Sequence, residues 1–171
     1  MTINNFISRL VIIRNVAVHF RDITKNINPA KINNVEFKHY QDFGSNLPVF
    51  QQLQKQNLIT IKEVENILKD KGNTIGVAFF KDIPINVLAS FFSRKTCRSL
   101  NINPKTAIIG YAVTAQAHQG KGVNSSAIEN MMIYLKSQNV SQVALEIDAN
   151  NIASIKSTEK ADIYKLKVMK Y

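Results

Sequence analysis

The sequence of 171 residues lacks the features that mark secreted, disulfide-linked and membrane-spanning proteins. Its single cysteine, Cys97, excludes an internal disulfide, which is typical of a protein in a reducing compartment. No stretch approaches the roughly 20 consecutive apolar residues that a membrane-spanning helix needs. The apolar patch from Leu10 to Val18 follows Arg9, is interrupted by Arg14 and lacks a small-residue cleavage site, so it does not resemble a signal peptide. We therefore expect a cytoplasmic protein with no membrane attachment.

Repeats, linkers and metal-binding patterns are also missing. No internal repeat or low-complexity linker divides the chain, and 45% of its residues are hydrophobic, so we expect one domain over residues 1–171 that buries its own core. His118 stands alone in a polar turn, and His19 and His39 supply no metal-ligand spacing with it, so no metal site is predicted. Cys97 has no motif around it that would mark a nucleophile.

Positive charge, by contrast, is abundant: 22 Lys and Arg residues against 12 Asp and Glu residues give a formal net charge of +10. Such a surplus favours anionic partners, whether a phosphorylated cofactor, a nucleic acid or an acidic surface, without choosing among them. The simpler alternative is the solvated surface of a basic protein. No zinc-finger spacing, RNA-binding aromatic signature or long run of like charge makes nucleic acid the leading prediction. The cations gather in two clusters: Lys156, Lys160, Lys165, Lys167 and Lys170, and Arg94, Lys95 and Arg98.

The most informative stretch begins with residues 107–113, a short apolar and aromatic run that is typical of a buried strand. After a polar turn, Gln119-Gly120-Lys121-Gly122-Val123-Asn124 places two glycines just before a segment with helical periodicity. In that segment, apolar residues four apart fall on one stripe: Val123, Ala127, Met131 and Leu135. Asn139 is suited to the left-handed conformation that ends many helices. The stretch therefore predicts a strand, a glycine turn and a helix in sequence.

This order favours a phosphate site at the start of the helix. The first backbone N–H groups of a helix have no internal partner and carry the positive end of its dipole, so they attract phosphate. Lys121 adds a mobile cation to the turn. A glycine pair before a helix is equally compatible with a simple tight turn, so the motif alone does not establish a ligand.

The rest of the chain predicts a mixed α/β or α+β sheet. Antiparallel strands come first, followed by a strand-helix-strand unit whose two strands should be parallel, joined by a right-handed crossover. Thr60 to Glu63 has the capping-box pattern of a helix start, and the apolar stripe behind it stops before Gly72. The other expected elements are a strand at residues 9–14, short helices within 22–56, an antiparallel hairpin of 75–80 and 85–92, a loop at 93–105 and a strand at 143–147.

Taken together, these motifs resemble the GNAT superfamily of acyl-CoA N-acyltransferases, over roughly residues 76–171. The family's pyrophosphate loop has Gln or Arg, two residues, Gly, one residue, and Gly or Ala. Gln119 and Gly122 match this pattern, whereas Asn124 stands where the family has a smaller residue. The sequence Asn151-Ile-Ala-Ser154, with Glu-Lys a few residues later, is similar to the branch that acetylates protein N-termini, including those of ribosomal proteins.

The resemblance implies transfer of an acetyl or other acyl group from CoA to a primary amine, by direct attack of the amine on the thioester. It also implies a mostly antiparallel central sheet with flanking helices. The acceptor could be a protein N-terminus, an aminoacyl group on tRNA or a small amine, bound largely by residues 28–68 and the hairpin at 75–92. Positive charge slightly favours an acceptor attached to nucleic acid or the ribosome. The alternative is a non-catalytic GNAT-shaped module that binds CoA, nucleic acid or another protein.

The resemblance also implies where CoA lies. Its pyrophosphate falls on the backbone of Gln119, Gly120, Lys121, Gly122, Val123 and Asn124. Tyr111, Ala112 and Val113 offer backbone groups to the pantetheine arm and thioester, and the Val113 N–H is a candidate donor to the developing oxyanion.

The implied chemistry needs a base for the amine and a proton for the departing thiolate. Glu146 is the expected general base, the alternative being a strand carboxylate paired with a lysine. Asn151 is expected to hydrogen-bond pantetheine and Ser154 to protonate the thiolate; both residues are also suited to capping the next helix. Many family members have a tyrosine where Thr158 stands, and Tyr164 does not match that position.

The C-terminal end departs from the family pattern. GNAT folds generally have two more strands after the segment from Asn151 to Lys160, whereas only residues 163–171 remain here. Either the last strand is absent or a partner supplies it. An uncovered sheet edge is a place for another chain to pair, so a homodimer is a hypothesis.

Overall fold

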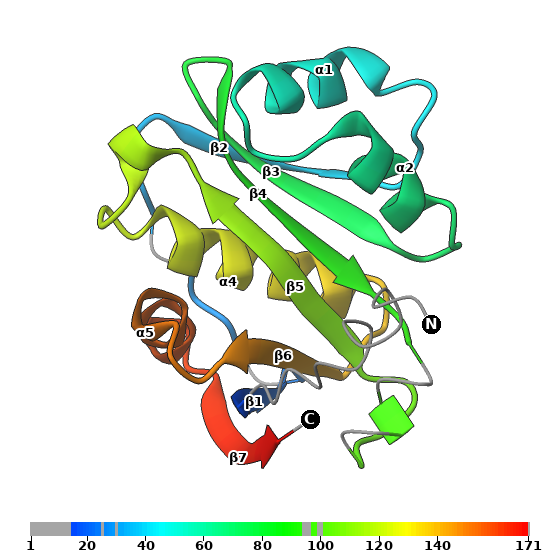
Figure 1. Cartoon of the computed structure of the whole chain (residues 1–171), viewed down its shortest axis with the longest axis vertical. Coiled ribbons are helices and arrows are strands. Elements are labelled where there is room, and N and C mark those ends of the chain that lie inside the picture. The colour runs from blue at the N-terminus through cyan, green and yellow to red at the C-terminus, as the bar shows by residue number, and fades with distance from the viewer. Residues whose placement is uncertain (1–14, 25, 30, 94–96, 99–100, 171) are drawn as a thin grey trace, which may run out of the picture.

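The computed structural model describes residues 15–24, 26–29, 31–93, 97–98 and 101–170, with residues 15–17 and 164–170 described by their backbone only. Within this part of the chain, seven strands form one sheet in the order β2-β3-β4-β5-β6-β1-β7 (Figure 1). The strands are β1 (Asn15–Asp22), β2 (Val35–Tyr40), β3 (Thr74–Phe80), β4 (Ile83–Phe91), β5 (Ala107–Thr114), β6 (Gln142–Asp148) and β7 (Tyr164–Lys170). The helices discussed below are α1 (Leu47–Lys55), α2 (Ile61–Leu68), α4 (Val123–Ser137) and α5 (Ile152–Lys160).

All neighbouring strands in this sheet are antiparallel except β5 and β6, which are parallel and joined through α4. The expected mixed, mostly antiparallel sheet with a strand-helix-strand unit and flanking helices is therefore confirmed. No helix in the described ranges has the length and apolar character needed to cross a bilayer.

Helices pack on both faces of the sheet, because successive side chains of a strand point to opposite faces. On β4, Val87 and Ala89 belong to a core with residues of α1 and α2, whereas Leu88 packs with residues of α4. The two cores are thus separated by the sheet. Figure 1 shows α1 and α2 together on the upper part of the near face and α4 running behind β5.

Several sequence predictions are confirmed in detail. The capping box at α2 is present: the Glu63 N–H donates to Thr60 Oγ1 at 3.2 Å, and the Thr60 N–H donates to Glu63 Oε2 at 2.8 Å. The hairpin of β3 and β4 turns at Lys81 and Asp82, which both have positive φ. Asn139, just past α4, has a φ of 62° and adopts the expected left-handed conformation.

The N-terminal third differs from the prediction. In the region expected to hold short helices, the structure has one α-helix, α1, and the unpredicted strand β2. The strand expected at residues 9–14 lies outside the described residues, and the strand β1 occupies 15–22. Arg94, Lys95 and Tyr171 also lie outside the described residues, so only Arg98 of the cluster Arg94, Lys95 and Arg98 is described.

The chain itself supplies a second strand at the C-terminal end of the sheet. β1 pairs antiparallel with β6 on one side and with β7 on the other, so the N-terminal strand lies between two C-terminal ones. Among the described residues, β7 is the one strand that follows α5, as expected, and β1 from the N-terminal part of the chain takes the place beside β6. The homodimer stays a hypothesis.

Candidate active site

The sheet opens between its two parallel strands. β5 and β6 pair only from Ala107 to Ile109 with Val143 to Leu145, although β5 continues to Thr114 and β6 to Asp148. A β-bulge in β5 accompanies the opening: Val87 pairs with Val113 and Ala89 with Gly110, so Tyr111 and Ala112 stand opposite Leu88 alone. A bulge bends its strand and increases the local twist, which directs the end of β5 away from β6.

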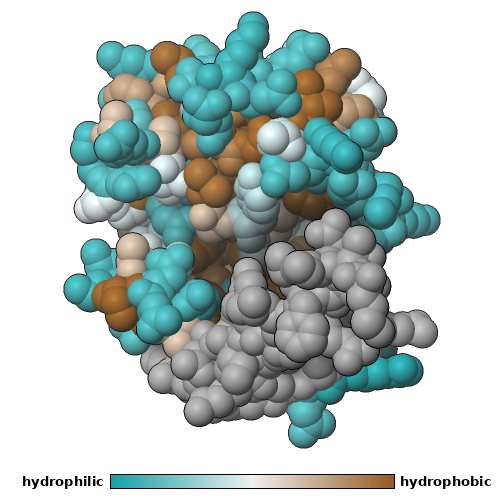
Figure 2. Space-filling model, in the orientation of Figure 1, coloured by the Kyte–Doolittle hydropathy of each residue, from teal (hydrophilic) through white to brown (hydrophobic). Residues whose placement is uncertain are grey.

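A cavity of about 190 Å³ lies in this opening, and we call it the wedge cavity. Four elements contribute its walls: the bulge of β5, the inner face of α4, the end of β6 and the first turns of α5. Its lining residues are Ile109, Gly110, Tyr111, Ala112, Asn124, Ile128, Leu145, Glu146, Ile147, Asp148, Asn151, Ser154 and Thr158. In the view of Figure 2, apolar side chains gather in the middle of the near face, between hydrophilic side chains over α1 and α2 and over α5.

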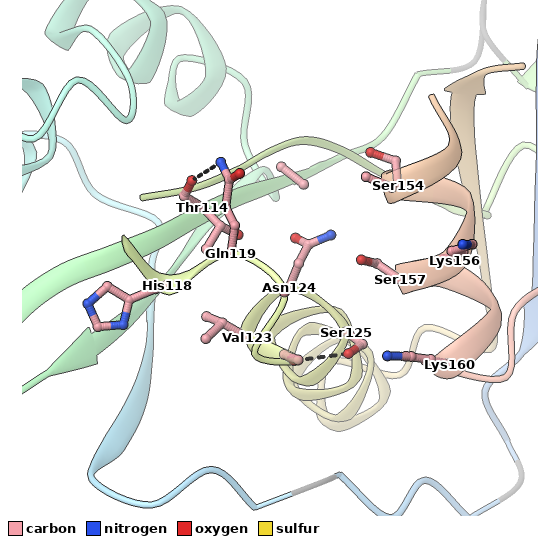
Figure 3. A pocket seen from close by; sticks show the side chains of 14 residues that line it. Thr114, His118, Gln119, Val123, Asn124, Ser125, Ser154, Lys156, Ser157 and Lys160 are labelled. Carbon is pink, nitrogen blue, oxygen red and sulfur yellow. Dashed lines mark hydrogen bonds between the residues drawn. The ribbon is translucent and has the colours of Figure 1, made fainter. Parts of the chain in front are cut away.

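A larger cavity of about 360 Å³ adjoins it at the start of α4, and we call it the loop cavity (Figure 3). It shares Ala112, Asn124 and Ser154 with the wedge cavity, so the two form one path along the start of α4. Its lining residues are Ala112, Thr114, His118, Gln119, Gly120, Gly122, Val123, Asn124, Ser125, Ala153, Ser154, Lys156, Ser157 and Lys160.

The glycines of the loop are needed for its backbone path. Gly120 and Gly122 have φ of 72° and 79°, a region that residues with a Cβ rarely adopt. Gly122 is the N-cap of α4 and has no side chain to satisfy the first N–H groups of the helix. These N–H groups stand at the wall of the loop cavity, so the helix start is available to an anion. Gln119 stabilises the turn, since its Nε2 donates to the Thr114 carbonyl at 3.0 Å.

Two lysines face the helix start from the opposite wall. Lys156 and Lys160, four residues apart on α5, line the loop cavity together with Ser157 (Figure 3). Lys121, which the sequence motif singles out, is exposed and does not line either cavity. The cationic wall is therefore on α5. The four-residue spacing within the C-terminal lysine cluster is the sequence signal that could have identified it.

Comparison with known families decides the assignment. The sequence pattern of the "Acetyltransferase (GNAT) family" matches residues 36–162, which is most of the chain. This chain belongs to the GNAT acetyltransferase family. Members of the family use an acyl-CoA as acyl donor. The match ends before β7 and begins after β1, so the two strands at the end of the sheet lie outside it. No curated protein sequence matches the chain.

Solved structures support the GNAT fold. The chain is similar to a GNAT-family acetyltransferase from Colwellia psychrerythraea, with TM-score 0.64, 10% identity, and coverage of 92% of this chain and 55% of that one. A GCN5-related N-acetyltransferase from Sphaerobacter thermophilus is similar with TM-score 0.67 and 9% identity, and the match covers 91% of this chain and 50% of that one. An aminoglycoside acetyltransferase from an uncultured soil metagenomic sample, in complex with sisomicin, is similar with TM-score 0.62 and 14% identity. That match covers 81% of this chain and 95% of the other. This chain thus spans about half the length of the first two, and such identities indicate a shared fold only.

In this GNAT protein, Glu146 lies at the wall of the wedge cavity. Its neighbours Leu145 and Ile147 pack in the core beneath α4, so the exposed Glu146 side chain points to the opposite face of the sheet. Among the residues whose side chains the structure describes, no lysine forms an ion pair with it. Asp148, two residues further along, lines the same cavity and accepts a hydrogen bond from the Asn150 N–H at 2.8 Å.

Asn151 caps α5, as the capping alternative predicts: its Oδ1 accepts from the Ser154 N–H at 3.1 Å. Both residues nevertheless line the wedge cavity, and Ser154 lines the loop cavity as well. Thr158, at the position where many family members have tyrosine, is buried and its hydroxyl donates to the Ser154 carbonyl at 2.9 Å.

Tyr111 and Val113 differ in their relation to the site. Tyr111 and Ala112 line the wedge cavity, whereas Val113 packs against the core under α1 and α2 and lines neither cavity. The Tyr111 hydroxyl lies 3.2 Å from Glu63 Oε2 on α2 and 3.3 Å from the carbonyl oxygen of Leu58, in the turn before α2.

The environment shifts the pKa values of Tyr111 and Glu63 in opposite directions. Burial, together with the hydrogen bond to Glu63, raises the pKa of Tyr111 to about 12, so its hydroxyl is protonated at neutral pH. Hydrogen bonds from Thr60 lower the pKa of Glu63. The sequence identifies the capping box of α2, but not that its glutamate also contacts the bulge of β5.

Proposed function

We propose that this protein is an N-acetyltransferase that moves an acetyl, or another acyl group, from CoA to a primary amine by direct attack on the thioester. The observation that carries the proposal is the pair of adjoining cavities. One has a helix start and two lysines suited to phosphates, and the other is an opening of the sheet that has a carboxylate at its wall. A path of this kind fits a donor with phosphates at one end and a reactive thioester at the other.

The loop cavity would hold the phosphates of CoA. The backbone N–H groups between Gln119 and Asn124 supply uncharged donors and the positive end of the helix dipole. Lys156 and Lys160 supply charge from the facing helix. Lys121 lies on the exposed side of the loop, where its long side chain would assist a phosphate only by moving towards it.

The wedge cavity would hold the pantetheine arm and the thioester, which supplies an activated acyl carbonyl when bound. Residues 110–114 of β5 have no partner on the β6 side, so backbone groups on that edge are available to hydrogen-bond the arm. We assign the oxyanion donor to the backbone of residues 111–113, and within it the bulge residues Tyr111 and Ala112 lie at the cavity wall. Asn151 would hydrogen-bond the arm from the opposite side.

Proton transfer would involve Glu146 and Ser154. The Glu146 carboxylate would accept the proton of the attacking amine, directly or through one water. The Ser154 hydroxyl, at the junction of the two cavities, would donate its proton to the departing thiolate and recover it from solvent. Thr158 would not take over this second role, because its hydroxyl is directed to the Ser154 carbonyl.

The amine acceptor would approach Glu146 from the face that also carries α1 and α2. We propose three acceptor classes: a protein N-terminus, as in the ribosomal-protein branch that the motif at Asn151 resembles, an aminoacyl group on tRNA, or a small amine. The Tyr111 contact with Glu63 places α2 beside the bulge, which supports residues 28–68 as part of the acceptor surface. We propose that the protein acts as a single domain in the cytoplasm. Nucleic acid is a possible partner.

The alternative is a GNAT-shaped module that binds CoA without turnover. The buried Thr158, in place of the common tyrosine, is the observation that favours it.

Release of free CoA thiol from acetyl-CoA, measured with a panel of amines, separates these possibilities. An enzyme would show amine-dependent release that falls in Glu146→Gln and persists in the control Glu159→Gln, an exposed glutamate on α5 that lines neither cavity. Binding of CoA without release for any amine class would favour the module. Binding of nucleic acid with an affinity that falls steeply with salt and does not change when CoA is added would instead indicate a nucleic-acid-binding protein.

A further inference from the structure

Asn124 occupies the junction of the two cavities. It is the second residue of α4, half-buried, and lines both the loop cavity and the wedge cavity, whereas Gly122, Val123 and Ser125 line only the first. A donor that reaches from one cavity to the other must pass this side chain. In Figure 3 its amide nitrogen points towards α5 and Ser157, and its oxygen points towards the opposite side.

A second asparagine, on strand β4, determines the orientation of the Asn124 amide. Asn86 on β4 is fully buried, and its Nδ2 lies 3.4 Å from Asn124 Oδ1 and 2.8 Å from Thr114 Oγ1. Because Asn86 donates to the Asn124 oxygen, the Asn124 amide is held with its nitrogen outward. The two ends of an amide have nearly the same shape, so without this contact either end could face the path.

Asn86 makes this contact at a cost. Its Oδ1 is buried and has no hydrogen-bond partner among the described residues. Leaving a buried acceptor unpaired costs about 1–3 kcal/mol, and such groups are uncommon in folded proteins. Violations of this kind are expected where a side chain serves a site rather than the core.

We infer that Asn124 is a hydrogen-bond donor to the pantetheine arm of acyl-CoA and that Asn86 is the positioning residue that aims it. The inference rests on the proposed function. The pantetheine arm joins the phosphates of acyl-CoA to its thioester. Asn124 lies where the loop cavity, proposed for the phosphates, meets the wedge cavity, proposed for the thioester. An amide N–H matches the carbonyl oxygens of the arm, and an inverted Asn124 would present an oxygen to them instead.

Calorimetric binding of CoA and of ADP tests the assignment, because ADP has a pyrophosphate but no pantetheine. Asn124→Ala should weaken CoA binding by about fivefold to tenfold, the value of one hydrogen bond, and change ADP binding by less than about twofold. Asn124→Asp, which keeps the shape and folds readily at a helix start, should weaken CoA binding further. Asn130→Ala, which alters another asparagine of α4, is the control and should change neither.

Asn86→Leu tests the positioning role. It should reproduce the loss for CoA, and the double variant should be no weaker than Asn124→Ala alone, since both changes remove one interaction. Additive losses, or no loss in Asn86→Leu, would overturn the role of Asn86. If Asn86→Leu does not fold, the two Asn124 variants still decide the donor role.

Three results would overturn the donor role. Unchanged or tighter CoA binding by Asn124→Ala would mean that the side chain only narrows the path. An equal loss for CoA and ADP would place its contact on the phosphates. A wild-type protein that binds ADP but not CoA would show that the path does not take the arm. Binding of neither compound would instead reject the proposed function itself.

Discussion

The loop cavity and the wedge cavity adjoin each other, yet the sequence encodes them in different ways. The loop cavity is formed mostly by one short stretch of sequence: most of its lining comes from residues 112–125, and the remainder comes from one face of α5. The wedge cavity requires β5, β6, α4 and α5 to meet, and its opening depends on where the pairing of β5 with β6 stops. Their charges differ as well, with lysines in the first and carboxylates in the second. A local motif can therefore identify the phosphate side of such a site more readily than its reactive side.

The largest predicted effect is at the loop. Gly122→Glu should weaken acetyl-CoA binding by at least about a hundredfold, because the new carboxylate repels phosphates and a left-handed residue with a Cβ costs about 1–2 kcal/mol. Titration calorimetry measures the loss. Gly122→Ala isolates the backbone cost, and a loss as large as that of the glutamate variant would assign the effect to strain rather than charge.

Glu146→Gln should test the wedge cavity without disturbing the loop cavity. We expect the acyl-transfer rate to fall by about a hundredfold or more, the usual contribution of a general base, with CoA affinity changed less than about twofold. Steady-state rates and calorimetry report the two quantities. A parallel loss of rate and affinity would mean that Glu146 supports the cavity structurally and would remove the chemical distinction between the two cavities.

Removing the cations of α5 should have a smaller effect. Lys156→Ala and Lys160→Ala should each weaken CoA binding by about threefold, with a larger loss at low salt, because exposed charges are screened by ions. Lys69→Ala, at the exposed end of α2, is the matched control. An equal loss in the control would indicate that the overall charge of the protein attracts CoA and that the α5 wall has no special part.

The smallest effect is expected for the contact between the bulge and α2. Tyr111→Phe removes the hydroxyl beside Glu63, and the transfer rate should fall by about threefold, the value of a modest hydrogen bond. The same variant should change the alkaline stability. The folded protein holds the Tyr111 proton more tightly than the unfolded chain, since its pKa rises from 10.0 to about 12. Stability should therefore fall as the pH rises from 10 to 12.

Thermal unfolding followed over that pH range measures this term. Tyr111→Phe should reduce the alkaline fall in melting temperature, whereas an identical fall in the variant would show that Tyr111 does not titrate with unfolding. Glu63 shifts the other way: its pKa is lowered in the fold, so its contribution is present above its ordinary pKa of 4.5 and is lost as the pH falls.

The sequence predicts the elements whose pattern is local. The stripe from Val123 to Leu135, the glycines of the loop and the capping box at Thr60 each lie within a few turns of chain, and the structure has them all. β2 also alternates, from Val35 to His39, although the asparagines around it favour turns. The sequence therefore carries a local strand pattern at β2.

Other features depend on contacts between distant segments and leave no local pattern. β1 is placed between β6 and β7 by pairing across more than a hundred residues, which a period-two pattern cannot specify. The contacts of Asn86 with Asn124 and of Glu63 with Tyr111 likewise join separate elements. Asn124 is identified in the sequence only as a departure from the family pattern, and its support from β4 comes from the fold.

The account depends most on the claim that the two cavities form one site for acyl-CoA. Calorimetric titration of acetyl-CoA into the wild-type protein tests this claim directly. The account predicts saturable binding with a micromolar dissociation constant and one molecule per chain, displaced by an excess of ADP. Absence of binding at millimolar acetyl-CoA would contradict the claim, and with it the proposed acyltransferase activity.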